Sequence, residues 1–200
     1  IARAYPADGM NVVSRVDWEN RNFYPQELYV DDRYLVVIGH QLEPHFYYRD
    51  SAGSATEGTP GSEARDAVNK TVMPIRPVFS TVKAIVFDIT DRSNIRQVRE
   101  IELEGNYVSS RKIDSVVYLV ANKNMDFYYI LEKEGNSHAA PYIRDTAAGG
   151  GYRPLDFNDI RYFPDDIEPN YILIAGFDLN QPDREMNVSS YIGSGQNIYA

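Results

Sequence analysis

The chain contains three histidines, His40, His45 and His138, and the first two lie five positions apart in the stretch "GHQLEPH". Imidazole nitrogens are common zinc ligands, but a zinc site needs a third or fourth ligand converging on the same point. Glu43 is close in sequence, yet this spacing matches no known zinc signature. The pattern therefore favours a pair of surface-loop histidines, and we predict no metal site here.

A group of carboxylates near residue 160 could supply the oxygen ligands that Ca²⁺ prefers. Their spacing does not alternate as it does in a calcium-binding loop, and the cations Arg153 and Arg161 are interspersed among them. We interpret them as solvated turn residues: Asp156, Asp159, Asp165, Asp166 and Glu168.

Four further aspartates stand at predicted turns. Asp88 and Asp178 each follow a strand-forming phenylalanine, and Asp31 and Asp114 lie at the tips of predicted hairpins. A short carboxylate at such a position accepts hydrogen bonds from the amides of its own turn. We therefore expect a structural role for all four.

The sequence shows no constellation for nucleophilic catalysis or phosphate binding. There is no cysteine and no Gly-x-Ser-x-Gly elbow, and "GSG" at 193–195 has no assignable histidine or acid partner. The "AAGGGY" stretch at 147–152 lacks the lysine and the following helix of a phosphate loop. Paired carboxylates for glycoside hydrolysis stay open, because their separation is a three-dimensional property. We predict no catalytic residue and no cofactor.

Residues 124–169 are rich in aromatic side chains, which could stack on a polysaccharide or a protein. The more common fate of large aromatic surfaces is burial, here by covering a sheet edge and packing among themselves. If they do bind a ligand, the side chains expected to do so are Tyr128, Tyr129, Tyr142, Tyr152, Phe157 and Tyr162.

Composition narrows the possible partners. The formal net charge is -9, with no run of Lys or Arg, which disfavours nucleic acid and anionic membrane surfaces because both require concentrated positive charge. No apolar run approaches the ~18–20 residues of a membrane-spanning helix. The chain begins at Ile1 without a recognisable signal peptide or a Met, which leads us to expect processing or a boundary there.

These side chains must be positioned by strands, because the sequence repeats a pattern of hairpins. "TVKAIVFDITDRSNIRQVREIELEG" (81–105) matches "YILIAGFDLNQPDREMNVSSYIGSG" (171–195): each has an apolar run ending in Phe-Asp, a turn and a second strand. Upstream, "ELYVDDRYLVVIG" (27–39) matches "SRKIDSVVYLVAN" (110–122), with Leu35-Val36-Val37 aligned to Tyr118-Leu119-Val120. On the return strand, Val98, Glu100, Glu102 and Glu104 share one face, which suits an outer strand that resists edge pairing.

Each unit is therefore a hairpin, an insertion and a second hairpin. The four strands without the insertion span about 40–45 residues, the size of a propeller blade. We predict an all-β fold: a β-propeller segment with about two complete four-stranded antiparallel blades, partial blades at both ends and long inter-hairpin insertions. A β-sandwich would explain the strands but not the recurring order of hairpins. The expected limits are 1–18 (end of a preceding blade), 25–104 (insertion 43–79), 107–193 (insertion 124–169) and 195–200 (start of a next blade).

Four phrases carry a family resemblance: "PQELYVDDRYLVVIG", "VFDITDRSNIRQVREIELEGNYVSSRKID", "EPNYILIAGFDL" and "GSGQNIYA". They resemble secreted bacterial and archaeal proteins with a C-terminal β-propeller domain distantly related to WD40 repeats. The resemblance implies export or a cell-surface location, and a propeller larger than this chain. It implies no reaction. The expected function is a non-catalytic scaffold that binds a protein or glycan at the cell envelope. The alternative is a hydrolase whose site lies at a central channel completed by blades outside this chain.

A propeller needs ~4–8 blades to close, so the outer blades are expected to present open faces. Leaving about 400 Å² of apolar surface wet gives up roughly 10 kcal/mol, a sizeable part of a domain's stability. We therefore expect this segment to self-associate through its open faces or to belong to a larger intact protein.

Overall fold

The structure is a computed structural model that describes residues 1–16, 22–43, 46–49, 55–58, 71–72, 79–125, 140–164, 168–193 and 195. The described chain is built from β-strands and three short 3-10 turns, η1 (Ala7–Gly9), η2 (Thr146–Ala148) and η3 (Phe157–Asp159). Among the described residues, no helix is long and apolar enough to cross a membrane. In the first insertion, β5 (Phe46–Arg49), β6 (Ala55–Gly58) and β7 (Thr71–Val72) form a separate three-stranded sheet.

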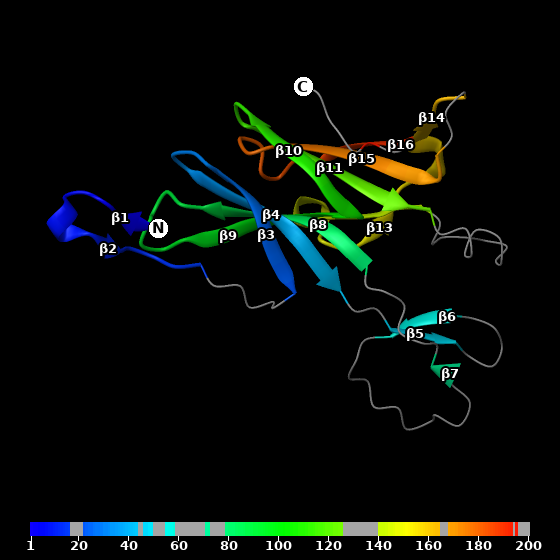
Figure 1. The fold of residues 1–200 in the computed structure, drawn as a ribbon, viewed down its shortest axis with the longest axis horizontal. Helices are drawn as coiled ribbons and strands as arrows, with labels where there is room; N and C mark the ends of the chain where they lie inside the picture. The colour runs from blue at the N-terminus through cyan, green and yellow to red at the C-terminus, as the bar shows by residue number, and fades with distance from the viewer. Residues whose placement is uncertain are drawn as a thin grey trace.

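The first blade consists of four antiparallel strands that lie in the sheet in the order in which they occur in the chain (Figure 1). They are β3 (Phe23–Val30), β4 (Tyr34–Glu43), β8 (Phe79–Asp88) and β9 (Arg96–Glu104). Asp31 closes the first hairpin as expected, because its Oδ1 accepts the backbone N–H groups of Arg33 at 3.0 Å and Tyr34 at 2.8 Å.

The second blade repeats this order in a separate sheet. It consists of β10 (Asn106–Ile113), β11 (Val116–Asn124), β15 (Asn170–Asp178) and β16 (Asn187–Ile192). The turns after the two Phe-Asp pairs match: Asp88 Oδ1 accepts the Thr90 N–H and Asp178 Oδ1 accepts the Asn180 N–H, each at 2.9 Å. The two matching sequence stretches are therefore equivalent hairpins in different sheets.

The junctions that leave each blade are equivalent too. Gly105 ends the first blade with a φ of 125°, and its N–H donates to Ser80 O at 2.7 Å. Gly193 follows the second blade with a φ of 151°, and its N–H donates to Asn170 O at 2.9 Å. Positive φ is inexpensive only for glycine, so both junctions require that residue.

The register of the first hairpins differs from the sequence alignment by one residue. Tyr34 pairs with Asp88 and Val116 pairs with Asp178, so Val36 is equivalent to Tyr118 and not to Leu119. The error matters because a slip of one residue exchanges the two faces of a strand. With the structural register, equivalent residues of both blades point in the same direction around the stack.

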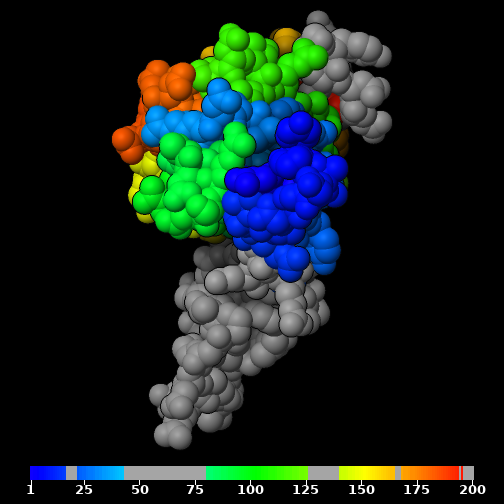
Figure 2. All heavy atoms as spheres, turned by 90° about the vertical axis from the view of Figure 1, so that its left-hand side faces the viewer, coloured from blue at the N-terminus to red at the C-terminus, as the bar shows by residue number. Residues whose placement is uncertain are grey.

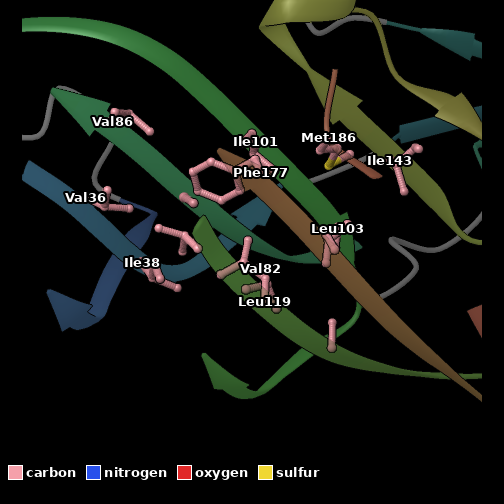
Figure 3. Close-up of a cluster of buried hydrophobic side chains, with 14 of the residues drawn as sticks. Val36, Ile38, Val82, Val86, Ile101, Leu103, Leu119, Ile143, Phe177 and Met186 are labelled. Atoms are coloured by element: carbon pink, nitrogen blue, oxygen red, sulfur yellow. The ribbon is translucent and has the colours of Figure 1, made fainter. Parts of the chain in front are cut away.

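The main core lies between the two blades, as Figure 3 shows. From the first blade it takes Val36, Ile38, Val82, Ala84, Val86, Ile101 and Leu103. From the second blade it takes the opposite face: Val117, Leu119, Ala121, Leu173, Ala175 and Phe177. Apolar residues on alternating positions of both sheets thus pack face against face, with both faces of the first blade in use.

A second cluster covers the other face of the first blade. It contains Phe23, Val37, Ile85, Phe87 and Ile89, with Val16 packed against it. The N-terminal residues form a hairpin of β1 (Ala2–Arg3) and β2 (Asn11–Val12). In Figure 2 these residues, dark blue, lie in front of part of the blade.

The second insertion adds strands to the outer edges of both blades. β12 (Tyr142–Asp145) pairs with β9, β13 (Arg153–Pro154) pairs with β12, and β14 (Ile160–Tyr162) then pairs parallel with β16. The prediction that β9 is an edge strand is therefore wrong. Its glutamates do not repel a neighbour, because basic side chains compensate them.

The fold is all-β, with two four-stranded antiparallel blades, a two-stranded hairpin before them and long insertions between hairpins. The two Phe-Asp segments lie in different sheets that stack face to face, as the propeller prediction requires.

Candidate functional site

The structure distributes the predicted aromatic residues over two places. Tyr128 and Tyr129 lie outside the described residues. Tyr142 is on β12, and Tyr152 immediately precedes β13, at the outer edge of the first blade. Phe157 in η3 and Tyr162 on β14 belong to the outer edge of the second blade, where Phe163 follows directly. One continuous aromatic platform is therefore not formed by the described residues.

Tyr152 is held in place by a buried carboxylate. Its hydroxyl donates to Glu102 Oε2 at 2.6 Å, and the Arg144 guanidinium lies 5.7 Å from its ring centroid. Glu102, only 1% exposed, also accepts hydrogen bonds from Thr81 at 2.9 Å and Arg144 at 2.7 Å. With Lys83 3.5 Å away, its charge is compensated. The part of the insertion that contains Arg144 and Tyr152 is therefore anchored to the first blade.

Glu100 belongs to the same network. Burial acts to raise the pKa of Glu100, but hydrogen bonds and ion pairs from Arg144 and Lys83 outweigh it and lower that pKa. Glu100 Oε2 lies 2.8 Å from Arg144 Nη1 and 3.2 Å from Lys83 Nζ. A carboxylate held ionised in this way supports an ion pair but is poorly suited to act as a general acid.

Tyr142 also anchors the insertion, through its backbone. Its N–H donates to Glu104 Oε2 at 2.8 Å, and Lys123 Nζ of the second blade lies 2.6 Å from the same oxygen. Glu104 thus connects the first blade, the insertion and the second blade. The half-buried Tyr142 side chain is not part of an exposed surface.

Three strongly exposed aromatic residues lie on β14 or within three residues of it. Phe157, Tyr162 and Phe163 are 55%, 61% and 62% exposed. The ring of Phe163 stacks on Tyr191 of β16, with centroids 6.1 Å apart and planes inclined by 10°. Arg161 lies 5.9 Å above the Tyr191 ring and donates to its hydroxyl at 3.3 Å. We call these five residues the β14 aromatic surface, in which Arg161 and Phe163 contact Tyr191, and Phe157 and Tyr162 are their neighbours along the chain.

Two members of this surface were not among the ligand-binding residues predicted from the sequence. Tyr191 and Arg161 meet only because β14 pairs parallel with β16, with Arg161 directly opposite Tyr191. They are 30 positions apart in the chain, and no local pattern indicates such a pairing. The repeat in fact assigns Tyr191 to an ordinary outer strand.

The first strands of the two blades, β3 and β10, carry a row of polar groups. The hydroxyls of Tyr29 and Tyr107 each lie 3.0 Å from Ser110 Oγ, and Lys112 Nζ is 3.2 Å from Asp31 Oδ2. Burial acts to raise the pKa of Asp31, but the amides of its turn and Lys112 outweigh it and lower the pKa. The Asp31 carboxylate beside these strands is therefore paired, and its lowered pKa does not suit a general acid.

His40 is a structural residue at the junction between blades. Its Nδ1 is 3.1 Å from Ser80 Oγ, and its Nε2 accepts the Tyr107 N–H of the second blade at 3.4 Å. Asn122 holds the equivalent position and donates to Gly195 O at 2.7 Å. Burial lowers the pKa of His40, as befits an imidazole that must stay neutral to accept.

The other predicted groups add no metal site among the described residues. His45, His138, Asp165 and Asp166 lie outside them. Asp156 closes a turn, because its Oδ1 accepts the Asn158 N–H at 2.9 Å. In the described part of the chain, no three His, Cys, Asp or Glu side chains are grouped so as to hold a metal ion.

Comparison with known proteins agrees with the stacked, repeated hairpins. A family model described as "Beta propeller domain" matches residues 1–200. No curated protein and no solved structure shows a significant match to the chain. With a family match over its whole length and two four-stranded blades in its structure, the chain belongs to the Beta propeller domain family.

Proposed function

We propose that this propeller segment is a non-catalytic scaffold of a secreted or cell-surface protein, and that it binds a protein or glycan at the cell envelope. In this proposal, residues 1–18 end a preceding blade and residues 195–200 begin a following one. The location and the distant relation to WD40 repeats rest on the sequence resemblance. Binding specificity resides in the second insertion.

The observation that carries the proposal is the contrast between the two halves of this insertion. The hydroxyl of Tyr152, a residue 44% exposed, and the backbone N–H of Tyr142 donate to buried, compensated carboxylates, whereas Phe157, Tyr162 and Phe163 are 55%, 61% and 62% exposed. Exposed large aromatic side chains in a cluster are typical of interaction sites, where one face of the ring stays available for stacking. The paired edge strands hold the cluster on a rigid scaffold, as a specific site requires.

The composition of the β14 aromatic surface fits uncharged or weakly acidic partners. Aromatic faces stack on the apolar faces of sugar rings or on apolar side chains, and Arg161 adds a donor for a hydroxyl or carboxylate. A strongly anionic partner is disfavoured by the net charge of -9. A strongly cationic one would meet Arg161 at the site itself.

The proposal is tested by binding assays with defined polysaccharides and purified envelope proteins immobilised in parallel. The decisive variant carries Phe157→Ala, Tyr162→Ala and Phe163→Ala, because removing the whole insertion would also remove the Arg99–Asp145 contact that joins it to the blades. Tyr152→Phe is the matched aromatic control. We expect one partner class to bind the wild type and the control, and the triple variant to lose at least tenfold in affinity. Equal binding by the triple variant, or no binding to either class, contradicts the proposal.

A further inference from the structure

Each blade is tied to the strand that follows it by a polar side chain near the end of its second strand. In the first blade this side chain is His40 of β4, which accepts the Tyr107 N–H of β10. In the second blade it is Asn122 of β11, which donates to Gly195 O. Tyr107 and Gly195 each lie two residues after a junction glycine, so the two contacts join equivalent positions of the repeat.

The His40 contact requires one particular form of the ring. Because Nε2 accepts the Tyr107 N–H, at 3.4 Å, that nitrogen carries no proton, and the proton of the neutral imidazole is on Nδ1. Nδ1 lies 3.1 Å from Ser80 Oγ and therefore donates to it. The ladder between β10 and β11 is irregular between Tyr107 and Ser109, at the point where the Tyr107 N–H is directed at the first blade. His40 thus acts as a neutral acceptor between two sheets.

Among the described side chains, no carboxylate is placed to hold His40 in its protonated form. The titratable side chains at this end of the surrounding strands are those of Tyr24 on β3, Glu104 on β9, Tyr107 on β10, Lys123 on β11 and Tyr171 on β15. Glu104, the one acid among these five, has its Oε2 2.6 Å from Lys123 Nζ, so its charge is already compensated. Burial therefore lowers the pKa of His40, and no charged partner in the described part of the chain opposes it.

We propose that His40 is a proton-sensitive latch between the two blades. The neutral ring holds the first strand of the second blade through the Tyr107 N–H. The imidazolium donates from both nitrogens, so its Nε2–H and the Tyr107 N–H face each other as two donors, and the junction opens locally. Asn122 does not titrate, so the contact at the next junction is unchanged at the same pH.

A second polar contact between the blades is expected to stay closed when His40 is protonated. The Met186 N–H of the second blade donates at 2.8 Å to Oδ2 of Asp145, on the strand that extends the sheet of the first blade. Burial acts to raise the pKa of Asp145, but Arg99 and backbone amides outweigh it and lower that pKa, so Asp145 stays ionised in mild acid. The two N–H groups that cross between the blades, of Tyr107 and Met186, therefore respond to different ranges of pH.

The neutral form of His40 makes the contact, and this fixes the direction of the pH response. The contact is fully present above about pH 6.5, the ordinary pKa of histidine. Because burial lowers the folded-state pKa of His40, the contact is lost as the pH falls through a value below 6.5. Opening is therefore a response to mild acid, and it reverses when the pH is raised.

The test is amide hydrogen exchange of the labelled chain, measured by NMR between about pH 7.5 and 5 and corrected for the intrinsic exchange rate. The His40 ring is titrated in the same samples through its own resonances. Protection of the Tyr107 amide is expected to fall about tenfold along the titration curve of the ring. Protection of the Met186 amide is expected to stay the same within about twofold, because Asp145 remains its acceptor.

His40→Asn is the matched variant, since it places the side chain of the second junction at the first. Its Tyr107 amide is expected to show no such pH dependence, although His45 and His138 are unchanged. The proposal is overturned if the Tyr107 and Met186 amides lose protection in parallel, if the His40 ring stays neutral down to about pH 5, or if the variant keeps the pH dependence of the wild type. The comparison of Tyr107 with Met186 is made within the wild type, so it does not depend on the folding of the variant.

Discussion

Arg99 and Asp145 form a bidentate ion pair in which the guanidinium donates to Oδ1 at 3.0 Å and to Oδ2 at 2.7 Å. Their side chains are 3% and 1% exposed. Asp145 also accepts the Met186 N–H of the second blade, and Arg99 donates to Arg184 O at 2.7 Å. One buried pair therefore joins the first blade, the second insertion and the second blade.

Breaking this pair on one side is expected to destabilise the chain strongly. Arg99→Met leaves the Asp145 carboxylate buried without its cation, which costs about 3–5 kcal/mol. Equilibrium unfolding in urea measures the change. The exposed pair Arg153–Glu185 is the control, and Arg153→Ala is expected to cost less than about 1 kcal/mol. Similar losses for the two variants would show that the Arg99 pair does not connect the blades.

The Arg99–Asp145 pair also predicts that the free energy of unfolding decreases at acid pH. Burial acts to raise the pKa of Asp145, but Arg99 and the amides of Met186 and Ala147 outweigh it and lower the pKa below the ordinary 3.8. The stabilisation is therefore complete above about pH 4–5 and is lost as the pH falls through the folded-state pKa. Urea midpoints measured from pH 6 down to pH 3 should fall more steeply for the wild type than for Arg99→Met/Asp145→Leu. Parallel curves would contradict this.

His40 predicts a second pH dependence, at a higher pH. Because burial lowers its pKa in the folded chain below 6.5, the unfolded chain takes up the proton first. Stability is thus fully present above about pH 6.5 and decreases as the pH falls below that value. His40→Asn, which copies the equivalent Asn122, should flatten the dependence of Tm on pH between about 6.5 and 5. His45 and His138 are present in both proteins, so the difference reports His40.

Gly105 is expected to resist substitution for two separable reasons. Its φ of 125° disfavours any side chain, and a Cβ there would lie 2.5 Å from Asn122 O. Gly149 shares the positive φ, 92°, but has no atom within 4 Å of its would-be Cβ. Gly149→Ala should therefore cost about 1 kcal/mol, and Gly105→Ala roughly 3 kcal/mol or more. Unfolding in urea compares them, and equal costs would remove the steric part of the argument.

Strands β8 and β9 show how much of the fold can be predicted from the sequence. Their apolar alternation, the Phe87-Asp88 turn and the repeat ninety residues later are local signals, and they predict the strands and their order correctly. The alignment of Val36 with Leu119 failed because a nearly continuous apolar strand has no alternation to fix its register.

The roles of the residues at the candidate site were predicted less well than the strands, because these roles depend on contacts between distant parts of the chain. Glu100 and Glu102 indicated an exposed edge because Arg144, which compensates them, lies more than forty residues away in the insertion. Tyr152 was expected to be a ligand-binding residue, and its hydrogen bond to Glu102 cannot be inferred from composition. When an insertion pairs with the edge of a blade, it brings together residues that are far apart in the chain. Sequence patterns therefore do not distinguish aromatic side chains that anchor the insertion from those that are available to bind a ligand.

The two halves of the insertion should respond to mutation in opposite ways. Tyr152→Phe removes a hydrogen bond to a buried charge and should cost about 1.5–3 kcal/mol, with ligand binding unchanged. Phe163 lies on an exposed surface, so Phe163→Ala should change the free energy of unfolding by about 0.5 kcal/mol or less while it weakens ligand binding. Unfolding and binding measured on the same samples test this. Weakened binding by Tyr152→Phe would merge the two halves into one site.

The most direct test of the stacked-blade architecture is a nuclear Overhauser spectrum of the labelled chain. The Arg99 guanidinium carbon lies 5.5 Å from the centroid of the Phe177 ring, although the two residues belong to β9 and β15 of separate sheets. We expect cross-peaks between the Arg99 side chain and the Phe177 ring protons, together with cross-peaks from the Val82 methyl groups to those of Leu119. Backbone cross-peaks that join β8 directly to β15 as neighbouring strands of one sheet would contradict the architecture.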